Sequence, residues 1–187
     1  MNIYDFDNTI FAGDSSVKFI KYSFCHHPLM VTWCFIKALK EYIKYLFKKS
    51  NFGYIKSELF SFVKNIDNLD EYMNDYVIKY QKNIKKFYLE QQKDDDVIIS
   101  ASFEFIVKPF CDALGIKNVI ATKYDTKKGC IIGKNCKGLE KIVRFNKIYK
   151  NPSVKEAYSD SLSDIPMFEI ADKAFLVKKD KLMPYEK

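Results

Sequence analysis

The stretch N-I-Y-D-F-D-N-T, residues 2–9, decides how the rest of the chain is interpreted. Residues 2–6 are mostly apolar and predict a short buried strand that ends in acidic residues, and a turn with Gly13 and Asp14 follows almost at once. On an extended backbone, residues i and i+2 point the same way. The carboxylates of Asp5 and Asp7 are therefore expected to approach one reacting centre from the same side.

Length and composition describe an ordinary globular protein. The chain has 187 residues, of which 48% are hydrophobic and 29% charged, which favours one domain, or one domain with an inserted segment, and excludes disorder. The acids at positions 5 and 7 interrupt any signal-peptide apolar region. The longest apolar run, residues 28–36, falls well short of the ~20 residues that cross a bilayer. We therefore expect a cytoplasmic protein without a membrane span.

The charge balance is basic, with 31 Lys and Arg residues against 24 Asp and Glu residues, a net charge of +7. Arg144 is the single arginine among these cations. Because base reading prefers the forked guanidinium of arginine, we expect no nucleic-acid partner, although a general affinity for anions remains open.

Residues 15–93 follow a helical period. The first helix has apolar residues on one face: Phe35, Leu39, Ile43 and Leu46. Its lysines lie on the opposite face: Lys37, Lys40, Lys44 and Lys48. Two further helices are predicted over residues 55–66 and 72–87, which makes an all-helical unit of this part of the chain.

After residue 96 the pattern alternates between strands and helices. Strands are predicted at 97–101, 118–124, 130–133, 155–159 and 174–178, and helices at 104–114, 138–147 and 165–171. Such alternation predicts an α/β fold, a Rossmann-like three-layer sandwich whose parallel sheet is covered by helices on both faces. If the first strand joins this sheet, residues 1–14 and 97–187 form the core and residues 15–96 an inserted helical cap.

Four carboxylates follow predicted strands: Asp5 and Asp7 after the first, Asp160 and Asp164 after the strand at 155–159. Ligand sites of open α/β sheets lie at these strand ends. Two charges ~4 Å apart repel by about 4 kcal/mol at an effective dielectric near 20, so such a gathering of acids indicates a bound cation. A ligand set made only of oxygens favours Mg²⁺.

The paired acids also suggest phosphoryl chemistry. One carboxylate can attack as a nucleophile while the other, its pKa raised by neighbouring charge, protonates the leaving oxygen and later activates water. Ser100, before the helix at 104–114, supplies a hydroxyl, and that helix supplies N–H groups for phosphoryl oxygens. Lys137 and Lys141 both begin the next helix, and spacing alone does not choose between them as the phosphate-binding lysine.

Four segments, in this order along the chain, resemble known sequence motifs: DFDNT (5–9), VIISAS (97–102), GLEK (138–141) and SDSLSDIPM (159–167). They resemble the four motifs of the haloacid-dehalogenase-like (HAD) hydrolase superfamily. The branch that the chain most resembles is that of the phosphoserine-phosphatase-like enzymes, which have a helical cap between the first two motifs. The resemblance spans nearly the whole chain.

The resemblance implies a role for each residue of the motifs. Asp5 would be the phosphorylated nucleophile and Asp7 the general acid/base, while Thr9, which closes the first motif, and Ser100 would bind the substrate. Lys141 is favoured over Lys137, because the family's lysine stands three residues after the glycine.

The same resemblance implies a Mg²⁺ site. Asp160 would bind the ion together with the Asp5 carboxylate and the backbone carbonyl of Asp7, and Asp164 would hold its outer shell. Dehalogenases of the superfamily lack the second acid of the D-x-D pair, so Asp7 argues against that reaction. The expected function is Mg²⁺-dependent hydrolysis of a small phosphomonoester through an aspartyl-phosphate.

Other interpretations remain open. Within the superfamily they are a phosphomutase or a lipid-phosphate phosphatase, and outside enzymes a non-catalytic module that binds anions or nucleic acid. Ser102 is predicted to be a simple N-cap of the helix that follows. The segment from Lys18 to Lys49 holds seven lysines and one acid. It would recruit anionic substrates, or rest against anionic lipid with Trp33 and Phe35 at the interface.

Overall fold

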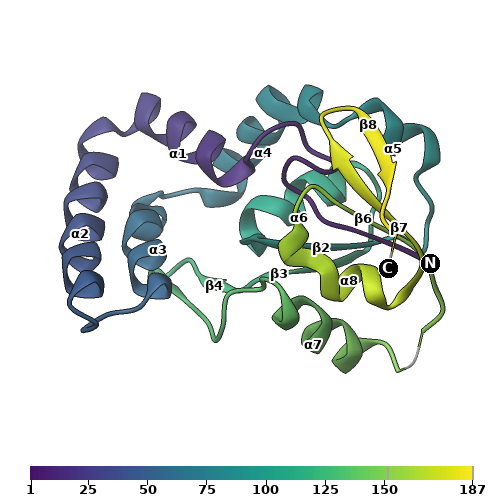
Figure 1. Cartoon of the computed structure of the whole chain (residues 1–187). Coiled ribbons are helices and arrows are strands. Elements are labelled where there is room, and N and C mark those ends of the chain that lie inside the picture. Colours follow the sequence, from purple (N-terminus) through teal and green to yellow (C-terminus); the bar gives the residue numbers. More distant parts are fainter. Residues whose placement is uncertain (151, 187) are drawn as a thin grey trace.

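Six strands form one sheet in the order β3-β2-β1-β6-β7-β8 in the computed structural model, which describes residues 1–150 and 152–186 (Figure 1). The strands are β1 (Asn2–Tyr4), β2 (Val97–Phe103), β3 (Asn118–Thr122), β6 (Val154–Ser159), β7 (Ala171–Lys178) and β8 (Lys181–Pro184). All neighbours pair in parallel except β8, which runs antiparallel to β7. The predicted parallel sheet is confirmed, with an antiparallel edge strand that was not predicted. Residues 151 and 187 of the expected core lie outside the described residues.

Strand β1 lies at the centre of the sheet although it has only three residues. Ile3 is in register with Val97 of β2 on one side and with Ala157 of β6 on the other. The Asp5 N–H donates to the Tyr158 carbonyl at 2.9 Å, which continues the pairing one residue past the strand. Because parallel strands end at the same edge, the residues after β1, β2 and β6 meet there.

Helices cover both faces of the sheet and make three layers. On one face, α7 (Leu139–Ile148) and α8 (Ile165–Glu169) pack through Phe145, Met167 and Phe168 onto the apolar side chains of β1, β2, β6 and β7. On the other face, α6 (Glu104–Ala113) packs through Ile106 and Phe110. The Rossmann-like α/β fold predicted from the sequence is thereby confirmed.

A helical segment lies between β1 and β2 along the chain. Its elements are α1 (Ser15–His26), α2 (Pro28–Leu46), α3 (Phe52–Phe60), η1 (Ser61–Asn65), α4 (Leu69–Tyr80), η2 (Gln81–Asn83) and α5 (Lys86–Gln91). Rings from α1, α4 and α6 share one core: Phe19 lies 5.2 Å from Tyr76, and Tyr76 lies 5.5 Å from Phe110, both edge to face. Helices α2 and α3 project from the rest of the molecule (Figure 1).

The helix predicted over residues 72–87 is wrong in its second half. It ends at Tyr80, and Ile84 instead forms an antiparallel bridge with Phe11, while the Lys85 N–H donates to the Ile10 carbonyl at 2.8 Å. Pairing with the segment after β1 competes with the helix here, and sequence periodicity does not reveal such a long-range backbone contact.

The strand predicted over residues 118–124 ends at Thr122. A small hairpin follows, in which β4 (Tyr124–Asp125) pairs with β5 (Cys130–Ile131). This hairpin supports α3: the Tyr124 hydroxyl donates to the Ser57 carbonyl at 3.1 Å, and the Ile131 N–H donates to Ser57 Oγ at 3.0 Å. Within the described residues, no helix is both long and apolar enough to cross a bilayer.

Candidate active site

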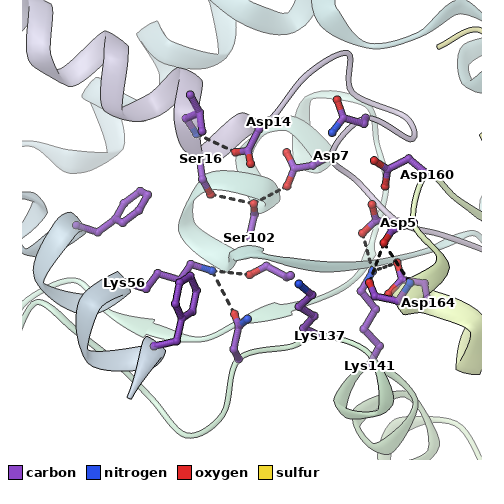
Figure 2. Close-up of a pocket in the computed structure, with 18 of the residues that line it drawn as sticks. Asp5, Asp7, Asp14, Ser16, Lys56, Ser102, Lys137, Lys141, Asp160 and Asp164 are labelled. Carbon is purple, nitrogen blue, oxygen red and sulfur yellow. Dashed lines mark hydrogen bonds and ion pairs between the residues drawn. The ribbon is translucent and has the colours of Figure 1, made fainter. Parts of the chain in front are cut away.

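A cavity of about 430 Å³ opens at the carboxyl edge of the sheet, facing α1 and α3 (Figure 2). The acidic residues that line it are Asp5, Asp7, Asp14, Asp160 and Asp164. The cationic residues that line it are Lys56, Lys137 and Lys141. Ser102 of the second motif also lines it, so residues from all four sequence motifs meet at one cavity together with a lysine from α3.

Lys141 joins the first and last motifs. Its buried Nζ lies 2.6 Å from Asp5 Oδ1 and 2.6 Å from Asp164 Oδ2 (Figure 2). Burial alone lowers the pKa of Lys141, but the two carboxylates outweigh it and the net shift is upward, so this lysine stays charged. Lys137 lines the same cavity, but its side chain is exposed. Of the two lysines that the sequence left open, Lys141 is the one that contacts Asp5 and Asp164.

The carboxyl group of Asp5 has an unusual pKa. Burial, which disfavours the charged form, raises its pKa to about 7, and Asp164 and Asp7 add to the rise although Lys141 opposes it. Desolvation is the main cause of the shift, and the single ammonium of Lys141 is shared between two carboxylates, Asp5 and Asp164.

Asp7 is fixed by two donors from different elements. The Ser15 N–H at the start of α1 donates to Asp7 Oδ1 at 2.6 Å, and the Ser102 hydroxyl donates to Asp7 Oδ2. Burial raises the Asp7 pKa, and these hydrogen bonds oppose the rise. The side chain of Asp7 is partly exposed to the cavity, where a group that exchanges a proton with a substrate has to be.

The prediction that Ser102 is a simple N-cap is wrong. The residue that precedes α6 is Phe103, and no side chain of the described residues caps this helix. Strand β2 continues to Phe103 with a register shift after Ser100, and this extension brings Ser102 to Asp7. The i, i+2 spacing of Ser100 and Ser102 on an extended strand was the signal in the sequence that could have identified Ser102.

Thr9 and Ser100 are buried and do not line the cavity. Thr9 Oγ donates to Asp5 Oδ2 at 3.3 Å and accepts the Asp160 N–H at 2.9 Å, so it ties the first motif to the last. Ser100 Oγ accepts the Ser102 N–H at 3.0 Å. Both hydroxyls therefore bond to other residues of the site, and the expectation that they bind substrate stays a prediction.

The turn after Asp7 depends on Asn8. Its φ of 56° lies in the left-handed region, which asparagine tolerates better than most residues. The Asn8 N–H donates to the Gly13 carbonyl at 3.1 Å, and Lys85 Nζ donates to the Asn8 carbonyl. This turn redirects the chain from β1 to the start of α1, so that the Ser15 N–H reaches Asp7.

Lys56 is the main cavity residue that sequence reasoning missed. From α3, its Nζ donates to the Ala101 carbonyl at 2.8 Å and to Asn135 Oδ1 at 3.2 Å, and it lies 4.3 Å from the centre of the Phe103 ring. Burial lowers its pKa to about 8, against the opposing charges of Asp7 and Asp14. In the sequence Lys56 is one lysine among many on a predicted helix, and nothing there distinguishes it.

The donor set fits a hard divalent cation. Asp164 Oδ1 is buried and has no hydrogen-bond partner among the described residues, and the one ammonium of Lys141 contacts two carboxylates, Asp5 and Asp164. No three Asp, Glu, His or Cys side chains in residues 1–150 and 152–186 form a ready metal-binding group. A cation here would therefore need backbone or water oxygens besides the carboxylates, which is how Mg²⁺ is usually held.

Comparison with known proteins agrees with these motifs. The model of the haloacid dehalogenase-like hydrolase family matches residues 3–169. The chain belongs to this family of hydrolases, as the four motifs predicted.

Individual relatives are more distant. A histidinol-phosphatase of Neisseria meningitidis serogroup C (strain 8013) is 27% identical over 142 residues, which cover 68% of this chain and 61% of that protein. The crystal structure of a protein of unknown function from Bordetella pertussis Tohama I has a TM-score of 0.73 at 16% identity and covers 94% of this chain and 88% of that one.

A third known structure has the same fold. A phosphoserine phosphohydrolase-like protein from Francisella tularensis subsp. tularensis SCHU S4 has a TM-score of 0.56 at 15% identity and covers 94% of this chain and 87% of that one. The two structures support the fold, and the chain spans about three fifths of the length of the Neisseria relative.

Proposed function

We propose that this chain is a Mg²⁺-dependent phosphatase that hydrolyses a small phosphomonoester through an aspartyl-phosphate on Asp5. The observation that carries the proposal is the placement of Asp5 and Asp7 on one cavity, with Asp5 bound by the buried ammonium of Lys141. The family's hydrolase chemistry and the phosphatase name of the Neisseria relative support the same reaction class. In this proposal residues 1–14 and 97–187 are the catalytic core and residues 15–96 the cap.

The first half of the reaction forms the covalent intermediate. An Asp5 carboxylate oxygen attacks phosphorus, and the bond between phosphorus and the ester oxygen breaks. Protonated Asp7 gives its proton to the leaving oxygen, which departs as an alcohol. Lys141 keeps Asp5 oriented and offsets the charge that gathers on the phosphoryl oxygens.

The second half releases phosphate. Asp7, now ionised, takes a proton from water, and the resulting oxygen attacks phosphorus and breaks its bond to Asp5. Free Asp5 and inorganic phosphate are the products. The hydrogen bonds from Ser15 and Ser102 keep Asp7 in place through both halves.

Asp5, the Asp7 backbone carbonyl and Asp160 would hold Mg²⁺, with Asp164 in its outer shell. The ion supplies positive charge that shields the incoming phosphate from the carboxylates. Thr9 holds Asp160 and Asp5 relative to each other.

Metal dependence gives the first test of the proposal. Mg²⁺ should raise the thermal unfolding temperature of chelator-treated protein and restore hydrolysis of an aryl phosphate, because the ion compensates the excess negative charge. Asp160→Asn should lose both effects. Asp14→Asn is the matched control: Asp14 lines the same cavity but caps α1 by accepting the Val17 N–H at 2.8 Å, and asparagine retains a cap acceptor. Full hydrolysis in excess chelator would contradict the metal requirement.

Ser102 is expected to act by positioning Asp7. Ser102→Ala should lower kcat by about tenfold or more, since a hydrogen bond to a charged group is worth ~1.5–3 kcal/mol, and should change KM less. Ser16→Ala removes only a 2.9 Å contact to the Ser102 hydroxyl, so we expect a smaller loss. Steady-state kinetics of both variants tests this positioning role. Equal losses of kcat in the two variants would refute it.

A further inference from the structure

Helix α2 carries an apolar stripe that no other described part of the chain covers. The helix packs inward through Val31, Cys34 and Ala38, which are buried. Its outward apolar side chains are 42–86% exposed: Leu29, Ile36, Leu39, Ile43 and Leu46. An exposed apolar surface of this extent indicates an interaction site rather than the scattered apolar residues of an ordinary surface.

These exposed residues lie on one side of the helix. Leu29, Ile36 and Ile43 are seven residues apart, and Leu39 and Leu46 each follow one of them by three, so all five share one stripe. Val31, Cys34 and Ala38 lie on the opposite side. Helix α2 packs on α3 and lies at the outer edge of the molecule (Figure 1). Because the stripe is opposite the buried residues, it faces away from α3. The sequence predicted this amphipathic period, but the structure leaves the apolar face uncovered.

A row of lysines, across the helix from Leu39 and Leu46, borders the edge of the stripe that Ile36 and Ile43 form. Lys37, Lys40 and Lys44 follow each other at helical spacing along one side. Lys48 and Lys49 extend the positive charge past the end of the helix, and residues 28–49 contain a single acid, Glu41, which is paired with Lys44 at 2.6 Å. Trp33, the single tryptophan of the chain, lies on the lysine side, 56% exposed, with Lys37 Nζ 6.0 Å from its ring centre.

We propose that α2 is a docking surface for the anionic lipids of a bilayer. An interfacial helix has an apolar face that enters the boundary of the acyl chains and lysines that meet the headgroups, with tryptophan at the same level. Its 19 residues extend about 28 Å, all of which can lie in the plane of the membrane. Long lysine stems also let the ammonium groups reach the headgroups while the stripe is buried.

The charges on this face of α2 favour a bilayer over a second copy of the chain as its binding partner. A symmetric dimer through this face would bring two lysine rows together, each with five lysines and one acid between residues 28 and 49. An anionic bilayer presents apolar and negatively charged layers at the depths where this face has apolar and positively charged side chains. The proposal does not depend on the phosphatase proposal, because none of these residues belongs to the candidate catalytic site.

Trp33 offers a direct probe in the unmodified protein. Its fluorescence emission should shift to shorter wavelength when vesicles of equimolar phosphatidylcholine and phosphatidylglycerol are added, because the ring leaves water. Pure phosphatidylcholine vesicles should give a smaller shift. The same samples, followed by co-sedimentation, give the partition coefficient.

Two variants test the two halves of the surface. The triple variant Ile36→Ser/Leu39→Ser/Ile43→Ser should lower partition into the mixed vesicles by at least about tenfold, because it removes the inserted side chains. Lys40→Gln should lower it about fivefold, the effect of one lysine near an anionic surface. The matched controls are Ile148→Ser and Lys147→Gln on α7, both exposed and outside this surface, which should bind as the unmodified protein does.

Several outcomes would overturn the proposal. They are the absence of binding to either vesicle, binding that the triple variant leaves unchanged, and a dimer in vesicle-free solution that the triple variant dissociates. All variants should hydrolyse an aryl phosphate at the rate of the unmodified protein. If no protein hydrolyses it, the phosphatase proposal fails while the binding result still stands.

Discussion

Asp5→Asn is expected to lower kcat/KM for an aryl phosphate by about 10⁴-fold or more, the scale of losing a covalent nucleophile. Asparagine has the shape of aspartate but no carboxylate oxygen that can attack phosphorus. Of its two carboxylate partners, the Lys141 ammonium would then keep Asp164. Steady-state kinetics in saturating Mg²⁺ checks this, and substantial turnover by the variant would contradict the assignment of the nucleophile.

The same variant separates loss of chemistry from loss of fold. In the metal-free protein, burial raises the Asp5 pKa from 3.8 to about 7, so between these values the folded state holds a proton that the unfolded state has released. The free energy of unfolding contributed by Asp5 therefore falls as pH rises from about 4 to about 7. Asparagine does not titrate, so at pH 8 Asp5→Asn should be at least as stable as the unmodified protein in urea unfolding. A large loss of stability would show that inactivity came from unfolding.

Lys141→Met is the second large effect. It leaves Asp5 and Asp164 buried without their shared cation, and breaking a buried ion pair by removing one partner costs about 3–5 kcal/mol. We expect that loss in the free energy of unfolding of the chelator-treated protein at pH 8, together with loss of turnover. The loss should be smaller at pH 5, where protonation of Asp5 relieves the repulsion.

Two further variants make the test specific to Lys141. Lys137→Met should change the free energy of unfolding by no more than about 0.5 kcal/mol, since Lys137 is exposed. Lys141→Met/Asp164→Asn should recover part of the lost stability, because it removes one of the unpaired charges. Equal effects of Lys137→Met and Lys141→Met would refute the central place of Lys141.

The parts that could be predicted from sequence are those in which local pattern and strand order coincide. The alternation after residue 96 predicted the parallel sheet, and the motif order predicted the family. The same reasoning predicted that Asp5, Asp7, Asp160 and Asp164 would lie together, because each follows a strand of one sheet. They all line one cavity.

The parts that could not be predicted depend on contacts between distant segments. The break after Tyr80 comes from the pairing of Ile84 with Phe11, and the role of Ser102 comes from the extension of β2 toward Asp7. Lys56 reaches the cavity only because the β4–β5 hairpin and α3 pack together. Helix α2 is a different case. Its periodicity predicted an amphipathic helix, but the sequence did not show that the rest of the chain leaves its apolar face exposed.

The proposed reaction passes through a covalent phosphate on Asp5, and that species can be observed directly. Unmodified protein is mixed with excess aryl phosphate and Mg²⁺, quenched during turnover, and reduced with borohydride, which converts an aspartyl-phosphate into homoserine. Peptide mass spectrometry should then find homoserine at position 5, and only in samples that received substrate. Rapid hydrolysis with Asp5 unmodified, or with the phosphate on another side chain such as Ser102, would contradict the account.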